Sequence, residues 1–392
     1  MGATLAATLA AAGLPTAVVD SAPLPPMELQ DFDGRAYAIA LTSKRLLEAS
    51  GIWDRLPAEP CPITAIRVAD GRPGEPASRL SLHFRADEVG PEPFGYMVEA
   101  RSLRVALNAR LPAMENLQVF APATATVERQ AEGRRSASPP GRCSAPDWWW
   151  RRKAATARCG ARPASGWRCS TTTRSAWWAP SPMNGRTGMS RWSNSCPMAP
   201  SRSFLAGPGG FGSAAWPHAS AFVWADRTVI ARRMLALDDA AFGRELARRL
   251  GDHLGAIRPI GRRWSYPLSA LQVERWTDTR LALIGDAAHG VHPIAGQGLN
   301  LGFRDVAALA EEMTAAWNAG ADPGAPTVLA RYQARRRPDT LLMLTGMHAL
   351  ERLFGNDFAP VRIARRLGIA AVDRIPALKR GFARQAMGLG PG

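Results

Sequence analysis

The stretch that most constrains the fold of this chain runs from Arg280 to Met313 and reads RLALIGDAAHGVHPIAGQGLNLGFRDVAALAEEM. An apolar strand ends at Gly285, a glycine-rich loop follows it, and an amphipathic helical pattern continues after Gly302. A buried strand that leads through a tight loop into a helix is a building unit of α/β proteins. We therefore predict an α/β fold in which this loop forms a ligand site.

Each part of the loop suits a flat cofactor that carries charge. Asp286 stands at the carboxyl end of the strand, where its carboxylate can accept hydrogen bonds from a polyol chain. Glycines let a main chain approach a ring closely, and Pro293 with Gly296 and Gly298 predicts a tight turn. Amides at the start of the following helix favour negative charge on such a ring. An acid that only caps the loop is the alternative interpretation of Asp286.

The same residues resemble the G-D-A-A-H-x-x-x-P-x-x-G-Q-G-x-N signature of the FAD-dependent aromatic hydroxylases that share the p-hydroxybenzoate hydroxylase fold. The resemblance implies that Asp286 holds the ribityl hydroxyls of FAD and that Pro293 lies against the isoalloxazine ring. It also implies that the main chain after Pro293 presents amides to the pyrimidine edge of that ring. The cofactor-binding positions expected in the loop are Gly285, Asp286, Pro293, Gly296, Gln297, Gly298, Leu299 and Asn300. No catalytic side chain is expected, because the flavin carries the chemistry.

The N-terminal residues resemble the remainder of an FAD-binding βαβ unit. The spacing predicts a small-residue helix over residues 3–12, a stop at Gly13 and a strand over Thr16–Asp20. In the complete unit a strand and G-x-G-x-x-G precede the helix, and only the last of these glycines, Gly2, is present. We therefore expect the first strand to be truncated, Gly2 to face the pyrophosphate and Asp20 to bind the ribose.

The implied architecture is a Rossmann-like FAD-binding domain interleaved with a mainly antiparallel β substrate domain and followed by C-terminal helices. Two further segments resemble those in which arginines, here Arg35 and Arg101, approach the cofactor. The expected FAD-binding parts are residues 1–60, 96–133 and 276–330. The expected substrate-domain strands lie in 61–95 and 217–275, the C-terminal helices in 331–392, and a segment of aberrant composition in 134–216.

Within this family, the hydroxylases of ubiquinone biosynthesis are the most similar subgroup, on the sequences HPIAGQGLNLGFRDVAALAE, RYQARRRPDT, LFGND and IPALKRGFARQAMGL. The resemblance implies an FAD-dependent monooxygenase that uses NAD(P)H and O2 to hydroxylate a polyprenylated phenol. A flavin hydroxylase of another phenolic compound and an inactive flavoprotein relic remain alternatives. The ring position, the choice between NADH and NADPH and the oligomeric state stay open.

The segment from Arg134 to Trp216 differs in composition from the rest of the chain. It carries 13 of the 49 Lys and Arg residues against one acid, and therefore most of the net charge of +16. It holds 8 of the 13 Trp and 4 of the 5 Cys residues, with no Val, Ile or Tyr. Clustered cysteines can bind metal, but no C-x-x-C pair occurs, and the spacing of His289 and His292 around Gly290 disfavours a helical metal site. We therefore expect no metal and reduced cysteines.

Because the flanking segments resemble one flavoenzyme, the segment between them indicates a slipped reading frame. Trp has the single codon TGG, so reading Asp147-Trp148-Trp149-Trp150 one base earlier gives Leu-Val-Val, and Lys153-Ala154 can become Glu-Gly. These residues would restore the strand and the acid-glycine pair that the family places beside FAD. We hypothesise that roughly residues 134–216 are translated out of frame. As written, the segment is expected to supply no central strand, which would leave the chain unstable or inactive.

Two surfaces bear on the partners of the protein. An Arg- and Trp-rich insert that binds nucleic acid is the alternative to a slipped frame, and we expect no nucleic-acid partner. The segment 361–392 has seven Lys and Arg residues against one acid, which fits either a solvated helical face or contact with an anionic membrane or a biosynthetic partner. The apolar N-terminus has no cation before its apolar run, which argues against a signal peptide. We expect a cytoplasmic protein, with a peripheral site at the inner membrane as the alternative.

Overall fold

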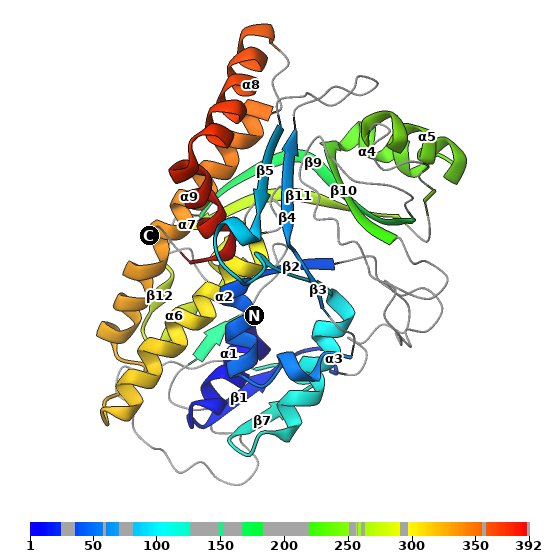
Figure 1. The fold of residues 1–392 in the computed structure, drawn as a ribbon. Helices are drawn as coiled ribbons and strands as arrows, with labels where there is room; N and C mark the ends of the chain where they lie inside the picture. The colour runs from blue at the N-terminus through cyan, green and yellow to red at the C-terminus, as the bar shows by residue number, and fades with distance from the viewer. Residues whose placement is uncertain are drawn as a thin grey trace.

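The computed structural model of the chain describes residues 1–24, 36–57, 60–69, 81–125, 149–151, 167–182, 219–250, 256, 258–259, 263–290, 297–354 and 358–389 (Figure 1). Three of the residues expected to bind the cofactor, Arg35, Pro293 and Gly296, lie outside these ranges. The architecture is α/β, as predicted from the sequence.

The N-terminal unit contains the helix and the strand expected from the sequence. Helix α1 spans Gly2–Ala11, and strand β1, Thr16–Val19, pairs in parallel with β7, Leu117–Phe120. Alanine, leucine and threonine make up most of α1, and the many alanines favour a helix. The helix ends because Gly13, at φ +87°, takes a left-handed conformation and its amide donates to the carbonyl of Ala10.

A second group of elements is organised around strand β6. The bounds are β2, Ala36–Ala40; α2, Leu41–Ala49; the 3-10 turn η2, Trp53–Arg55; β3, Cys61–Pro62; β6, Gly95–Glu99; α3, Ala100–Arg110; and η4, Leu111–Ala113. Strand β6 lies between β2 and β3 and is antiparallel to both. Cys61 is disulfide-bonded, whereas the sequence predicted reduced cysteines.

A separate antiparallel hairpin consists of β4, Ala65–Ala69, and β5, Ser81–Arg85, and it is followed by the short turn η3, Ala86–Glu88. Both strands lie in the range 61–95, where the sequence predicts strands of the substrate domain. On β5 the side chains alternate, with Leu82 and Phe84 buried and His83 and Arg85 exposed. The alternation follows from the two-residue repeat of a strand that packs on one face only.

The segment with the loop signature forms a strand, a turn and a long helix. The bounds are β12, Thr277–Asp278; β13, Leu281–Leu283; η5, Gly285–Ala287; β14, His289–Gly290; and α6, Gly298–Asn318. Strand β13 lies between β12, which is antiparallel to it, and β8, Trp149–Arg151, which is parallel to it. The signature therefore follows a central strand, as the sequence predicts.

The largest sheet has the order β10-β9-β11-β14 and is antiparallel throughout. Its other strands are β9, Trp167–Pro182; β10, Ala219–Arg227; and β11, Trp264–Val273. Helices α4, Thr228–Leu235, and α5, Asp239–Leu250, follow β10. The expectation that residues 134–216 supply no central strand is wrong for this structure, because β9 lies between β10 and β11. Three consecutive threonines, Thr171–Thr173, and several tryptophans give β9 enough strand preference without valine or isoleucine.

Three helices complete the chain: α7, Pro326–Phe354; α8, Ala359–Arg374; and α9, Pro376–Met387. The boundary that the sequence indicated at residue 330 falls inside α7. In Figure 1 these helices lie along one side of the molecule, and α7 runs beside α6. Among the described residues, no helix is both long enough and apolar enough to cross a membrane.

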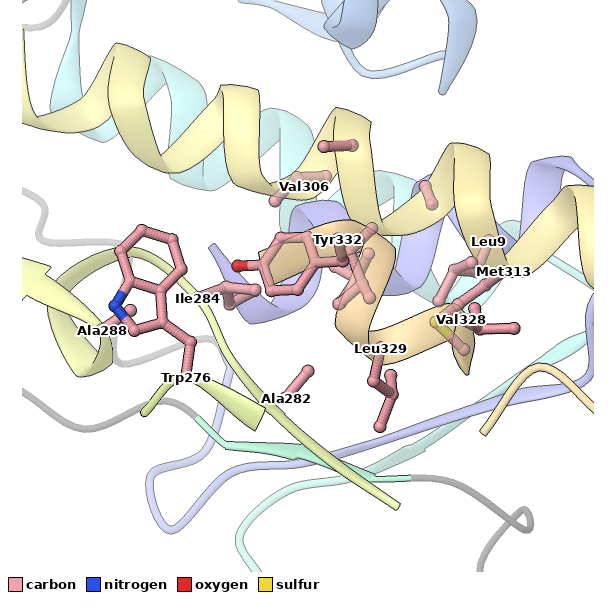
Figure 2. Packing of buried hydrophobic residues seen from close by; sticks show 14 of the residues in the cluster. Leu9, Trp276, Ala282, Ile284, Ala288, Val306, Met313, Val328, Leu329 and Tyr332 are labelled. Carbon is pink, nitrogen blue, oxygen red and sulfur yellow. The ribbon is translucent and has the colours of Figure 1, made fainter. Parts of the chain in front are cut away.

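The main apolar core forms where α1, α6, α7 and β13 meet. Figure 2 shows Leu9, Ile284, Val306, Met313 and Tyr332 in this cluster, and all five are buried. The Tyr332 hydroxyl donates a hydrogen bond to the carbonyl of Leu283 on β13 at 2.8 Å. Burial raises the pKa of Tyr332 well above its ordinary value, so the phenol stays protonated and keeps this donor. The core therefore fixes β13, and the loop that follows it, against two helices.

Candidate functional site

The turn after β13 places Asp286 at the surface and buries the residues on either side of it. Gly285 and Ala287 are buried, whereas Asp286 is exposed, and within the described part of the chain no hydrogen bond uses its carboxylate. Gly285 has φ +55°, which glycine adopts without strain. The carboxylate of Asp286 is therefore available to accept hydrogen bonds from the hydroxyl groups of a ligand.

The start of α1 lies against this turn. A Cβ atom on Gly285 would stand 2.8 Å from Met1 Cγ, and one on Gly302 of α6 would stand 2.6 Å from Met1 Sδ. Glycine at both positions is what lets α1 approach the turn and α6 so closely. Gly2, expected to face the pyrophosphate, lies buried in the first turn of α1, and no side chain caps that turn. A helix N-terminus in this position suits an anionic group.

A second helix N-terminus, that of α6, begins close to the turn. Gln297 is the N-cap residue of α6, and no side chain caps the helix. The amide of Leu301 makes the first bond of the helix, to the carbonyl of Gln297 at 2.9 Å. The amides of Gly298, Leu299 and Asn300 therefore have no partner within the helix and form the positive end of its dipole. These three residues are among those that the sequence assigned to the cofactor.

The side chain of Asn300 is used within the protein rather than presented to a ligand. Its Oδ1 atom accepts from the Ala40 amide and from Ser43 Oγ, each at 2.9 Å. Its Nδ2 atom donates to the Ala38 carbonyl at 2.8 Å and to Gln297 Oε1 at 3.4 Å. All four hydrogen-bonding positions of the amide are thus occupied. Asn300 therefore joins the β2–α2 connection to the start of α6, and only its main chain remains for a cofactor.

Of the two arginines expected at the cofactor, only Arg101 lies among the described residues, shortly after β6. Ala36, the residue after Arg35, pairs with Glu99, two residues before Arg101. Arg101 lies half-buried in the first turn of α3, and its Nε atom is buried with no hydrogen-bond partner in the part of the chain that the structure describes. A ligand oxygen is one group that could accept from this donor.

Asp20 occupies the end of β1, where the sequence placed the ribose-binding acid. It is half-buried, and its Oδ1 atom accepts a hydrogen bond from the Ala22 amide at 3.0 Å. This bond forms a local turn that fixes the direction of the carboxylate.

A buried ionic network behind the turn was not predicted from the sequence. Asp305 on α6 is fully buried, and its Oδ2 atom lies 2.6 Å from His289 Nε2 and accepts from the Gly285 amide at 2.9 Å. Its Oδ1 atom accepts from Arg336 Nε of α7 at 2.9 Å. The sequence carried only a weak signal for this network, an acid four residues after Leu301 and four before Leu309 in the helical pattern.

The network continues along α7 through Asp339. Burial alone would lower the pKa of Arg336, but the carboxylates of Asp305 and Asp339 raise it above its ordinary value. Burial would likewise raise the pKa of Asp339, but Arg336, which donates to it at 2.5 Å, and Arg304 hold that pKa below its usual range. Both groups are therefore charged near neutral pH.

The arrangement fits FAD on the evidence of its own residues. It combines an exposed carboxylate with no partner in the described residues, two uncapped helix N-termini, glycines that allow close approach, and the unpartnered Nε of Arg101. A carboxylate can accept from hydroxyl groups, and helix N-termini and an arginine can bind phosphate oxygens. Glycines let the main chain approach a flat ring. The described residues contain no cluster of His, Cys, Asp or Glu that could hold a metal ion.

Comparison with known proteins places these features in a family. The model of an FAD binding domain matches residues 164–344. The chain is 43% identical to the ubiquinone hydroxylase UbiL of Rhodospirillum rubrum over 398 residues, a match that covers 100% of this chain and 89% of that protein. It is 29% identical to the 3-demethoxyubiquinol 3-hydroxylase of Escherichia coli, covering 99% of this chain and 96% of that protein.

Solved structures share the fold at lower identity. The p-nitrophenol 4-monooxygenase PnpA of Pseudomonas putida superimposes with a TM-score of 0.68 at 15% identity, covering 99% of this chain and 95% of that one. The probable FAD-dependent monooxygenase pqsL of Pseudomonas aeruginosa gives a TM-score of 0.66 at 20% identity, covering 93% of this chain and 96% of that one.

The fold and the site define a flavin-dependent monooxygenase of the aromatic hydroxylase class, with FAD as its cofactor. More narrowly, the chain belongs to the family of ubiquinone-biosynthesis hydroxylases. The family and the cofactor predicted from the loop signature are both confirmed.

Proposed function

We propose that the protein hydroxylates the aromatic ring of a polyprenylated phenol in ubiquinone biosynthesis, with NAD(P)H and O2 as co-substrates. The observation that carries the proposal is the exposed carboxylate of Asp286, which has no partner among the described residues and lies near two uncapped helix N-termini, in a chain similar along its whole length to a ubiquinone hydroxylase. When bound, FAD supplies the transfer of one oxygen atom from O2 to an electron-rich ring carbon.

In this proposal the residues of the chain bind and orient the cofactor. Asp286 accepts hydrogen bonds from the ribityl hydroxyls, and Asp20 accepts them from the ribose. Gly2, at the start of α1, lets the pyrophosphate approach, and Arg101, with Arg35 from the neighbouring segment, donates to cofactor oxygens. The loop residues Pro293 and Gly296 belong to the same proposed site, on the resemblance of the sequence.

The N-terminus of α6 provides electrostatic stabilisation in the proposed site. The free amides of Gly298, Leu299 and Asn300 lie at the positive end of a helix of 21 residues, and they stabilise negative charge on the ring. The side chain of Asn300 supports this role indirectly, because it fixes the first turn of α6 to β2 and α2.

Replacement of the strand-end acid tests the proposed function. We expect Asp286→Ala to weaken FAD binding by roughly 10- to 100-fold, because a hydrogen bond to a charged acceptor contributes about 1.5–3 kcal/mol. The visible absorbance of the purified protein and titration of the apoprotein with FAD measure this loss. Product analysis with a prenylated phenol then measures hydroxylation.

Asp87→Ala is the matched control, because Asp87 is an exposed acid that pairs with Arg85 on β5, on the separate hairpin. This variant should bind FAD and hydroxylate the phenol as the unchanged protein does. If the unchanged protein folds but is colourless and takes up no FAD, the proposal is contradicted.

We propose further that α8 and α9 place the enzyme on an anionic membrane surface, where a lipid-soluble substrate is found. Apolar side chains are exposed along these helices at Ile363, Leu367, Leu378 and Phe382. Arg374 and Arg380 are exposed on the same helices and carry the charge that anionic headgroups attract. On this proposal the protein is cytoplasmic and peripheral to the inner membrane.

A further inference from the structure

The buried carboxylate of Asp305 serves two parts of the molecule at once. Oδ1 accepts from Arg336 of α7 at 2.9 Å, and Oδ2 accepts from the Gly285 amide at 2.9 Å and lies 2.6 Å from His289 Nε2. Gly285 precedes Asp286 by one residue and His289 follows it by three. One oxygen therefore faces the neighbouring helix, and the other holds both sides of the turn that carries Asp286.

A purely structural ion pair between α6 and α7 would not need this arrangement. A buried charge is costly unless it is paired and hydrogen-bonded, and Arg336 already supplies an opposite charge at Oδ1. The same two helices are already joined by a second pair, since Asp339 accepts from both Arg336 and Arg304. The two bonds to Gly285 and His289 therefore have a separate consequence, which is to fix the turn.

The imidazole of His289 is held from two sides. It is almost fully buried, its ring centroid lies 5.2 Å from that of Trp276, and its Nε2 atom contacts Asp305 Oδ2. The Trp276 amide in turn donates to Gln333 Oε1 of α7 at 2.7 Å. The turn is thus anchored to α6 through Asp305 and to α7 through the neighbours of His289.

We propose that Asp305 is a positioning residue of the flavin site, which sets the direction of the Asp286 carboxylate by fixing Gly285 and His289 relative to α6. The inference rests on the proposed function in one respect, that FAD binds at Asp286. Asp305 itself touches no cofactor in this proposal. It acts because α6 carries both its carboxylate and the free amides of Gly298–Asn300, so that both halves of the site share one rigid support.

Asp305→Asn provides the first test. The carboxylate accepts from donors on both of its oxygens, and an asparagine amide group must turn its NH2 toward one of these donors. We expect faster amide hydrogen exchange in the peptide that contains Gly285–His289, and FAD binding to the apoprotein weaker by on the order of tenfold, as loss of a charge-assisted bond implies. A shift of the flavin absorption band is a further expected change.

Asp339→Asn is the matched control, since it removes a partner of the same Arg336 without touching the turn. It should lower the unfolding temperature and leave FAD affinity and exchange at Gly285–His289 unchanged. The inference would be overturned if Asp305→Asn matched the unchanged protein in amide exchange and in FAD affinity. It would also be overturned if Asp305→Asn and Asp339→Asn lost the same FAD affinity.

A second pair of variants covers the case in which Asp305→Asn does not fold. His289→Gln retains an N–H group that can donate to Asp305, and His289→Leu does not. We expect His289→Leu to show fast exchange in the turn and weak FAD binding, and His289→Gln to recover part of both. Identical behaviour of the two variants overturns the inference. Amide exchange is measured on the apoprotein and does not depend on FAD binding. If the protein binds no FAD, the proposed function is contradicted, and the exchange at Gly285–His289 still tests the role of Asp305.

Discussion

Asn300 shows how a single residue can belong to a cofactor site without offering its side chain to the cofactor. The loop signature predicts it as a cofactor-binding residue, and the structure places it in the first turn of α6 with its amide fully used by Ala38, Ala40, Ser43 and Gln297. Partners that lie about 260 residues away in the chain cannot be found from local spacing.

We predict that Asn300→Leu lowers the stability of the protein and leaves FAD binding less affected. The buried Ala40 amide would lose its acceptor, which costs roughly 1–3 kcal/mol in the free energy of unfolding. Thermal and denaturant unfolding of the apoprotein measures this change. If Asn300→Leu left stability unchanged and abolished FAD binding alone, the side chain would be a direct ligand instead.

Asp286 and Asp305 differ in how far the sequence could identify them. Asp286 follows an apolar strand and precedes glycines, so its place at a strand end and its chemistry are both local properties. Asp305 lies within a helical pattern, where an acid commonly points to solvent. Only the packing of α7 against α6 buries it and supplies Arg336.

At the scale of elements, strand β8 connects the structure with the unusual composition of residues 134–216. Trp149–Arg151 pairs in parallel with β13, directly beside the strand that leads to Asp286. The resemblance implies a strand next to FAD in this part of the chain, and reading Asp147-Trp148-Trp149-Trp150 one base earlier gives Leu-Val-Val. The backbone arrangement therefore agrees with the hypothesis that an apolar family strand is encoded there.

We predict that resequencing the coding DNA reveals two compensating frame changes that flank roughly residues 134–216. A protein expressed from the corrected frame should unfold at a higher temperature and bind more FAD per mole than the chain as written. The physical reason is that strands of parallel sheets usually read as runs of valine, isoleucine and leucine, which the shifted frame supplies and a run of tryptophan and arginine does not. A single uninterrupted frame through this window would contradict the hypothesis.

At the scale of the whole molecule, the C-terminal helices extend the flavin enzyme with a surface that is both apolar and basic. Figure 1 shows α8 and α9 beside α7 at the side of the molecule, continuous with the helix that packs on α6. The sequence identified the basic character of this segment and favoured a solvated face over a membrane contact. The exposed apolar side chains on α8 and α9 favour the membrane.

We predict that the protein floats with vesicles that contain anionic lipid and that high salt releases it, because screening weakens attraction between Arg residues and headgroups. The double variant Leu367→Gln with Phe382→Gln should float less and still bind FAD. Val229→Gln on α4, which also removes an exposed apolar side chain, is the control and should float normally. Equal flotation of the double variant and the unchanged protein would exclude these helices as the membrane contact.

The sequence by itself determined the α/β class, because local spacing of apolar residues and glycines sets it, and the resemblance of its loop signature identified the family and the cofactor. It misjudged the strands in 134–216, since composition understates what threonine and tryptophan can form. The tertiary structure alone decided the hydrogen-bond partners of Asn300 and Asp305 and the close approach of α1 to Gly285 and Gly302. Those features depend on contacts between segments far apart in the chain, and only packing brings such segments together.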